Sequence, residues 1–133
     1  MLAAYVKTDL ALLYTQTLIA QGAMTETDHS LMALRLSKPL EGANSETYTR
    51  IGMDLYRLNA SQLSKTAYQQ AIKADESNTT AIVNLGWLLY REGHYEEAIT
   101  LYRDALGKDD TSIAWFNLAL AYLAAGSDCG FNF

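Results

Sequence analysis

A repeat of 34 residues constrains the fold of this chain more than any other feature of its sequence. When residues 48–71 are laid on residues 82–105, small side chains fall on small ones and apolar side chains on apolar ones, and Gly52 coincides with Gly86. A third copy follows at an offset of 33 residues and starts near Trp115. Repeats of this length are typical of units that stack, because one unit alone cannot bury its apolar face.

Within each copy, apolar residues recur at steps of three and four, which predicts two helices joined by a tight turn. In the second copy, Gly93 is expected to end the first helix in a left-handed conformation, and Glu96 and Glu97 suit the first turn of the next helix. Gly107 and the Lys-Asp-Asp-Thr segment that follows it are expected to end that second helix. The sequence predicts a single domain with four parts: a degenerate repeat or capping hairpin over 1–44, complete repeats over 45–78 and 79–111, and a partial repeat over 112–133.

The first 44 residues fit the repeat only weakly. If Gly22 occupies the turn inside a worn repeat, its two helices face each other through a few apolar or small residues. The core positions are then expected at Tyr14, Leu18, Thr27, Leu31 and Leu34. The alternative is an unrelated helical hairpin that covers the end of the stack, since terminal units of repeat arrays are atypical.

Composition excludes several function classes. Half of the 133 residues are hydrophobic, and the formal charge is 10 − 15 = −5 with no basic stripe, which argues against nucleic acid as a partner. The single cysteine, Cys129, cannot form an intrachain disulfide, which fits the cytoplasm. His29 and His94 have no partners at metal-ligand spacing, and no stretch is apolar enough to span a membrane. We therefore expect a non-catalytic protein with no metal and no cofactor.

The best copy reads Ile82-x2-Leu85-Gly86-x2-Leu89, followed by Ala98-x3-Tyr102-x2-Ala105. This spacing resembles the tetratricopeptide repeat, and the resemblance extends over Ser45–Gly126. It implies an all-α fold, an α-solenoid of stacked antiparallel helix-turn-helix repeats wound into a right-handed superhelix. Four positions depart from the family pattern, namely Ser64, Glu76, Asp110 and Ala119.

In this family the first helix of each repeat lines a concave groove, so the resemblance implies a peptide-binding surface. The residues expected to line it are Thr49, Arg50, Met53, Tyr56, Arg57, Val83, Asn84, Trp87, Tyr90, Arg91, Phe116, Asn117 and Leu120. Aromatic and arginine side chains anchor interfaces, and asparagine pairs with peptide backbone. We expect a protein or peptide partner with an apolar anchor near Trp87 and an acidic group or C-terminal carboxylate near Arg57 and Arg91.

Structural explanations compete with this interpretation. Asn84 and Asn117 could bridge helices, and Tyr56 and Tyr90 could be half-buried between repeats. Arginines close to helix C-termini are also favoured by the helix dipole alone. The lysines of the family's chaperone-tail clamp are replaced, with Ile113 at one of their positions, so binding of a chaperone tail is not expected.

The last predicted helix shows apolar residues that no second helix of its own repeat covers. Those expected to form an oligomer contact are Trp115, Leu118, Tyr122 and Leu123. A homodimer or higher oligomer is the favoured explanation. The alternatives are that the tail 129–133 folds back onto this helix, or that the chain is cut from a longer protein.

The sequence thus predicts a non-catalytic scaffold that binds a peptide or protein partner in the groove of its first helices. Two alternatives stay open. One is a dedicated chaperone or assembly factor for an exported or membrane-bound client, and the other is a regulatory repeat domain associated with an enzyme.

Overall fold

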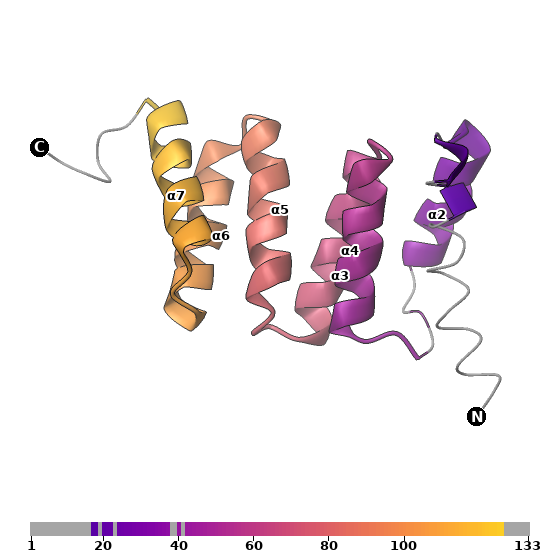
Figure 1. Ribbon diagram of the computed structural model, residues 1–133, viewed down its shortest axis with the longest axis horizontal. Coiled ribbons are helices and arrows are strands. Elements are labelled where there is room, and N and C mark those ends of the chain that lie inside the picture. Colours follow the sequence, from indigo (N-terminus) through magenta and orange to yellow (C-terminus); the bar gives the residue numbers. More distant parts are fainter. Residues whose placement is uncertain (1–16, 19, 23, 38–39, 41, 127–133) are drawn as a thin grey trace, which may run out of the picture. The chain divides into compact units, whose positions relative to one another are not determined.

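The computed structural model describes residues 17–18, 20–22, 24–37, 40 and 42–126, which form six α-helices and no strand (Figure 1). The helices are α2 (Glu26–Leu36), α3 (Ser45–Arg57), α4 (Ser61–Ala74), α5 (Thr79–Arg91), α6 (Tyr95–Lys108) and α7 (Ser112–Ala124). The chain divides into two compact units between Glu76 and Ser77, with α2 to α4 in one and α5 to α7 in the other. These helices confirm the expected all-α class of helical repeats.

The turn inside each complete repeat closes with the same backbone hydrogen bonds. After α5, Gly93 has a φ of 88°, and the amide that follows it donates to the Leu89 carbonyl at 2.9 Å. After α3, Asn59 stands in place of glycine with a φ of 60°, and the equivalent bond to Leu55 is also 2.9 Å. Glycine and asparagine tolerate this left-handed conformation best, so Asn59 can take the place of the glycine in the first complete repeat.

Helix α6 ends at Lys108, inside the segment 107–111 that the sequence predicts to stop it. The helix does not end at Gly107 but continues to Lys108, whose ammonium donates to the Asp104 carboxylate at 2.9 Å. Gly107 lies on open surface, with nothing within 4 Å of the place where a Cβ would stand. Glycine has a low helix propensity, which disfavours a helical conformation at Gly107. The hydrogen bonds of the neighbouring helical turns outweigh this cost.

In each complete repeat the two helices meet where a glycine of the first lies under a tyrosine of the second. A Cβ at Gly86 would stand 2.7 Å from Cε1 of Tyr102, and a Cβ at Gly52 would stand 2.5 Å from Cε1 of Tyr68. Both distances are shorter than van der Waals contact, so the tyrosine rings rest directly on the helix backbone. In the first repeat, the buried Ser64 hydroxyl adds a hydrogen bond of 2.6 Å to the Gly52 carbonyl. The small residues of the repeat therefore permit a close helix crossing.

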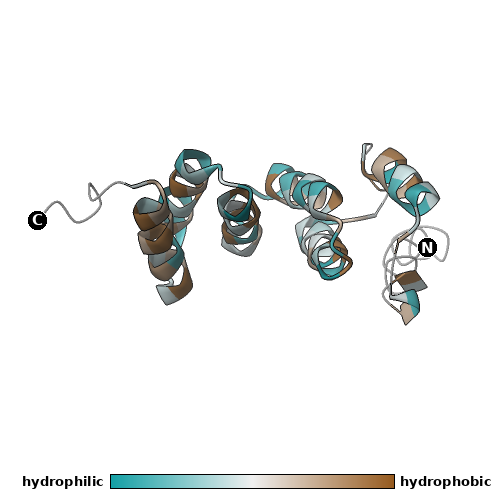
Figure 2. Ribbon diagram, turned by 90° about the horizontal axis from the view of Figure 1, so that it is seen from above, coloured by the Kyte–Doolittle hydropathy of each residue, from teal (hydrophilic) through white to brown (hydrophobic). Residues whose placement is uncertain are grey.

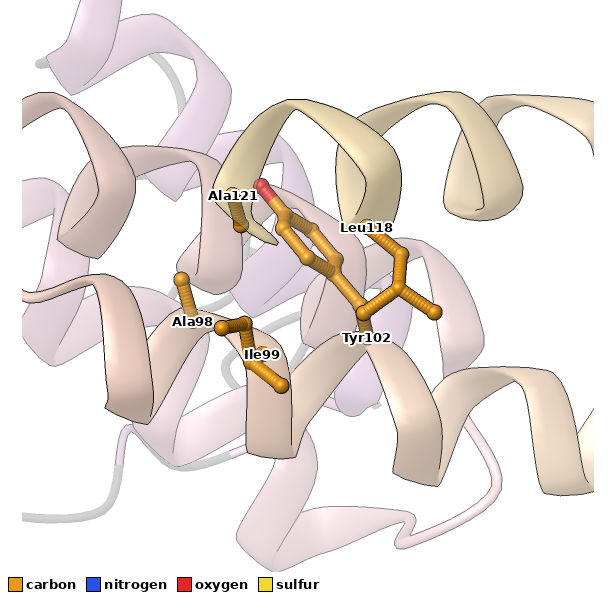
Figure 3. Close-up of a cluster of buried hydrophobic side chains, with 5 residues drawn as sticks. All are labelled: Ala98, Ile99, Tyr102, Leu118 and Ala121. Atoms are coloured by element: carbon orange, nitrogen blue, oxygen red, sulfur yellow. The ribbon is translucent and has the colours of Figure 1, made fainter. Parts of the chain in front are cut away.

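Tyr102 also joins α6 to α7. Its ring lies beside Leu118 and its hydroxyl end lies near Ala121, both on α7 (Figure 3). The Tyr102 side chain is completely buried, and its hydroxyl makes no hydrogen bond with any described residue. Burial raises the pKa of Tyr102 well above its ordinary value, with a smaller contribution from Tyr90. One side chain thus holds both α5 and α7 against α6.

The register predicted for the first unit is wrong in part. Met32 and Leu36 are the buried residues of α2, whereas Leu31 is 48% exposed and Leu34 is 66% exposed. Thr27 is exposed as well, while Leu18 is buried as expected, and Tyr14 lies outside the described residues. The apolar stripe of α2 is shifted by one or two positions, because its packing against α4 decides which side turns inward.

We expect Gly86→Ala to destabilise the protein although alanine is the better helix former. The gain in helix propensity is about 1 kcal/mol, but the new methyl group would overlap the buried Tyr102 ring and cost about 1–3 kcal/mol. Urea unfolding followed by circular dichroism measures the difference. The matched control is Gly107→Ala in open space, which should raise the free energy of unfolding by about 0.5–1 kcal/mol. A Gly86→Ala variant as stable as the control would contradict the close crossing.

We expect Tyr102→Phe to leave the free energy of unfolding unchanged at neutral pH or to raise it by about 1 kcal/mol, because the lost hydroxyl has no partner among the described residues. Unfolded tyrosine ionises near pH 10, and the folded state keeps the proton at higher pH. Wild-type stability should therefore fall as pH rises above about 10, and the variant should lose less.

Tyr48→Phe provides the contrast for this prediction. The Tyr48 hydroxyl accepts a 2.7 Å hydrogen bond from the Leu40 amide, so its removal should cost about 1 kcal/mol at neutral pH. Urea unfolding at neutral and alkaline pH compares the two variants. A similar loss in both at neutral pH would show that the Tyr102 hydroxyl also has a partner.

Candidate functional site

One side of α5 combines apolar, polar and aromatic residues that are not fully buried, of which Val83 and Tyr90 also pack partly against the core cluster of α6 and α7. The buried residues Ala81, Ile82, Leu85 and Leu88 occupy the packed sides of the helix. The remaining residues follow one another at steps of one and three, which places them along one stripe. They are Val83, Asn84, Trp87, Tyr90 and Arg91, all five expected from the sequence.

A hollow of about 200 Å³ lies at the start of this stripe, between α5 and α7. Its lining comes from the first turns of both helices and from the connection between α6 and α7. The lining residues are Thr79, Thr80, Val83, Asn84, Asp109, Thr111 and Ile113. The hollow is smaller than the roughly 300–1,000 Å³ of most small-molecule pockets, so it has room for a side chain rather than a whole cofactor.

The chemistry of the hollow is mixed. The methyl groups of Val83 and Ile113 provide apolar wall, whereas the Asn84 amide can both donate and accept hydrogen bonds. Asp109 contributes a carboxylate, which accepts hydrogen bonds at neutral pH. Thr111 is occupied as the N-cap of α7, where its hydroxyl accepts from the Ala114 amide at 3.3 Å. The site can therefore hold a short side chain and also pair with a backbone amide or carbonyl.

An aromatic cluster follows one turn further along α5. The Trp87 and Tyr90 rings stack with centroids 5.4 Å apart and planes inclined by 22°. Tyr95, at the start of α6, extends the cluster with a centroid 5.6 Å from that of Tyr90. All three side chains are half-buried, so each ring is fixed on one side and open to solvent on another. Such rings offer contact area at a low cost in conformational entropy.

Arg91 is exposed in the last turn of α5, where the helix dipole favours a cation. On α7, Phe116 is 65% exposed, while Asn117 and Leu120 are half-buried. These α7 residues occupy the repeat positions of Val83 and Asn84 and of Trp87. The second unit thus carries eight of the expected groove residues, and Val83 and Asn84 come together in the hollow.

The expected groove residues of α3 belong to the other unit. Arg50 and Arg57 are exposed and form ion pairs within their own helix, with Glu46 at 3.2 Å and Asp54 at 3.1 Å. The Arg50–Glu46 pair is exposed on both sides and contributes little to stability, whereas the Asp54 side chain of the second pair is only 13% exposed. Met53 is exposed and Tyr56 is half-buried.

Two predicted positions need correction. Thr49 is only 7% exposed, and its hydroxyl donates to the Ser45 carbonyl at 2.9 Å, so it does not offer its side chain to a partner. Leu118, expected at an oligomer contact, is also 7% exposed because it packs on Tyr102 of α6. Of the other expected contact residues, Trp115 and Leu123 are exposed and Tyr122 is half-buried.

The three- and four-residue spacing of apolar residues did not indicate several of the residues that the structure places at the candidate site. Asp109 and Thr111 lie in a connection, and the sequence did not show that this connection borders the first turn of α5. Tyr95 lies at the start of α6, and its contact with Tyr90 depends on the angle of the turn between the helices. Ile113 was noted only as the replacement of a lysine. The repeat itself could have indicated that this connection lies near the groove. Each such connection leads from the second helix of one repeat to the first helix of the next, and the first helices line the groove.

Among the described residues, no three side chains of histidine, cysteine, aspartate or glutamate lie close enough to hold a metal ion. None of the helices formed by these residues has the length and apolarity needed to cross a membrane.

Comparison with known proteins agrees with this architecture. The chain matches the tetratricopeptide repeat family over residues 49–113 and 83–128, which together cover more than half of it. It is also 36% identical over 75 residues to a protein of Komagataeibacter xylinus named cellulose synthase operon protein C. That match covers 55% of this chain but only 6% of the relative. The chain therefore belongs to the tetratricopeptide repeat family, whose repeats generally mediate contacts between proteins and are generally non-catalytic.

Proposed function

We propose that the chain is a scaffold that binds a peptide segment of another protein along the first helices of its repeats, above all along α5 and α7. The observation that carries this proposal is the hollow beside Asn84, which lies on the same stripe of α5 as the Trp87–Tyr90 stack. A hollow, an amide and an open aromatic pair in one line give an extended peptide three different contacts.

The length of the stripe defines the size of the ligand. From Val83 to Arg91 the helix rises about 12 Å at 1.5 Å per residue. An extended peptide covers this distance with roughly four residues. A ligand of four to six residues can therefore place a short side chain in the hollow, pair its backbone with Asn84 and lay an apolar side chain on Trp87.

Charge at the far end of the stripe favours an acidic ligand group. Arg91 presents a guanidinium beyond the aromatic pair, and a guanidinium can hold a carboxylate through two parallel hydrogen bonds. Arg57 occupies the same repeat position on α3. Its guanidinium is 63% exposed, so a partner's carboxylate can approach it from the solvent side.

A library of random peptides displayed on phage tests this proposal with the whole chain as bait. The best selected peptide is then titrated by fluorescence polarisation against wild type, Asn84→Ala, Trp87→Ala and the Arg57/Arg91 double alanine variant. We expect Trp87→Ala and the double variant each to weaken binding about tenfold or more, because buried aromatic and arginine anchors dominate such interfaces.

Arg103→Ala is the matched control, since Arg103 is an exposed arginine on α6, outside the stripe. It should leave the affinity unchanged. The proposal fails if no peptide is selected. It also fails if selected peptides bind folded Trp87→Ala and Asn84→Ala as tightly as wild type.

A second candidate is a repeat segment that works beside a polysaccharide-synthesising enzyme. The name of the relative from Komagataeibacter xylinus favours it, although the match covers 6% of that protein. Affinity capture from the native host, with the wild-type chain as bait and Trp87→Ala beside it, tests this candidate. Recovery of such an enzyme with wild type and its loss with Trp87→Ala is expected, and capture without any subunit of such an enzyme would contradict the candidate.

A further inference from the structure

The hollow beside Asn84 contains one charged side chain, and its charge is negative. Of the seven described residues that line the hollow, six are neutral, and Asp109 has a carboxylate. Residues 79–90 of α5 and 112–124 of α7 include no acidic or basic side chain, and α7, next to the C-terminal label, is coloured hydrophobic over most of its length (Figure 2). Residues 77–126 have a formal charge of 3 − 6 = −3, which favours the approach of a cation.

The Asp109 carboxylate is not used by the part of the chain that the structure describes. It is exposed and forms no hydrogen bond or ion pair with any described side chain. Both neighbours in the sequence differ from it. The Lys108 ammonium donates to the Asp104 carboxylate at 2.9 Å, and the Asp110 carboxylate accepts from the indole N–H of Trp115. Asp109 therefore keeps its full capacity to accept hydrogen bonds from a ligand.

Further acceptors and an apolar wall surround this carboxylate. The Asn84 amide and the hydroxyls of Thr79 and Thr80 line the same hollow, and each of these groups can accept a hydrogen bond. Val83 and Ile113 form the apolar part of the wall. Lysine and arginine side chains lay their carbon stems on apolar surface and keep the charged head at its edge. Such a side chain matches the wall with its stem and the acceptors with its head, and only the charged end has to enter the hollow.

The starts of α5 and α7 border the hollow and oppose a cation, but only weakly. A helix N-terminus is equivalent to about half a positive elementary charge. Both starts are also capped, since the Asn78 side chain accepts from the Ala81 amide at 3.0 Å and the Thr111 hydroxyl accepts from the Ala114 amide at 3.3 Å. Asp109 carries a full negative charge and stands at the C-terminal end of α6, where the helix dipole is negative as well. The balance at the hollow is therefore negative.

The spacing along α5 determines which ligand residues meet which contacts. Val83 at the hollow, Trp87 in the aromatic cluster and Arg91 follow one another at steps of four residues, and each step corresponds to a helix rise of about 6 Å. In an extended peptide, side chains on the same side recur at every second residue, about 6.6 Å apart. The hollow, the aromatic cluster and the guanidinium therefore match ligand residues that are two positions apart.

We propose that the hollow selects a basic side chain, lysine or arginine, of the bound peptide, and that Asp109 is the residue that determines this specificity. The inference rests on the proposed function and adds a sequence pattern to it. The pattern is a basic residue at the hollow, an apolar residue two positions away on Trp87 and an acidic residue two positions further on Arg91. Since Asp109 and Arg91 have opposite charges, they also fix the orientation of the peptide along α5.

Selection from the random peptide library, with the whole chain as bait, tests the pattern directly. Wild type is compared with Asp109→Lys, which reverses the charge at an exposed position and should leave the fold intact, as circular dichroism can show. We expect wild type to enrich lysine or arginine two positions from a hydrophobic residue. The Asp109→Lys variant should enrich aspartate or glutamate at the same position, because the sign of the charge in the hollow is reversed.

Titration then measures the coupling between Asp109 and the basic side chain. The best wild-type peptide is acetylated at its N-terminus, and a second version carries norleucine in place of the basic residue. Both are titrated by fluorescence polarisation at low salt against wild type and Asp109→Asn. We expect the norleucine version to bind wild type about fivefold or more weakly, and to bind Asp109→Asn less than about twofold more weakly, because the interaction is already lost there.

Glu96→Gln is the matched control. It removes the same charge from an exposed position in the first turn of α6, and Glu96 does not line the hollow. In this variant the norleucine version should still bind about fivefold or more weakly than the basic peptide. A loss of this difference in Glu96→Gln would mean that the net charge of the chain, and not Asp109, attracts the basic residue.

Three further results would overturn the inference and leave the proposed function standing. One is a set of selected peptides that depend on Trp87 and have no basic residue at this position. Another is an acidic residue there with wild type, which would show that the helix starts outweigh Asp109. The third is an equal effect of norleucine in wild type and Asp109→Asn, which would place the basic side chain elsewhere. Failure to select any peptide would instead refute the proposed function, and this inference with it.

Discussion

The contact between a glycine backbone and a tyrosine ring determines how the helices of this protein can approach each other. Gly86 has no Cβ, so the Tyr102 ring rests on the backbone of α5, and the same pairing recurs between Gly52 and Tyr68. A larger residue at either glycine would push the helices apart, because the buried ring has nowhere to move. The glycine positions of the repeat therefore allow its two helices to approach more closely than larger side chains would permit.

The same tyrosine links this local contact to the candidate site. Because Tyr102 touches Gly86 on one side and Leu118 on the other, it places α5 and α7 together against α6. Their first turns then border the hollow beside Asn84. The core uses the packed sides of α5 and leaves the stripe with Asn84 and Trp87 only half-buried. The proposed binding surface and the core are thus two sides of one helix, and the crossing of the helices decides which side is buried.

Helix α7 shows what happens when a repeat position has no covering helix among the described residues. Its inner side is buried against α6 like that of any first helix, while Trp115 stays exposed where Ile82 is buried. Trp115 and Ile82 are both large and apolar, so their different exposure comes from the helix that packs beside each of them and not from the residue type. Exposure of a hydrophobic residue at a position that the repeat normally buries is therefore more informative than exposure of Phe116, which occupies a groove position.

The sequence by itself determined the helices and their turns. The three- and four-residue spacing of apolar side chains located the helices, and Gly93 located the turn of the second complete repeat, because these signals act over a few residues. It also placed Asn84 and Trp87 on a single stripe of α5. Only the tertiary structure decided that Thr49 and Leu118 are buried, that Leu34 is exposed, and that Asp109 and Tyr95 join the site. Periodicity shows which residues share a side of a helix, but the neighbours that pack against that side decide whether it faces the core, a partner or solvent.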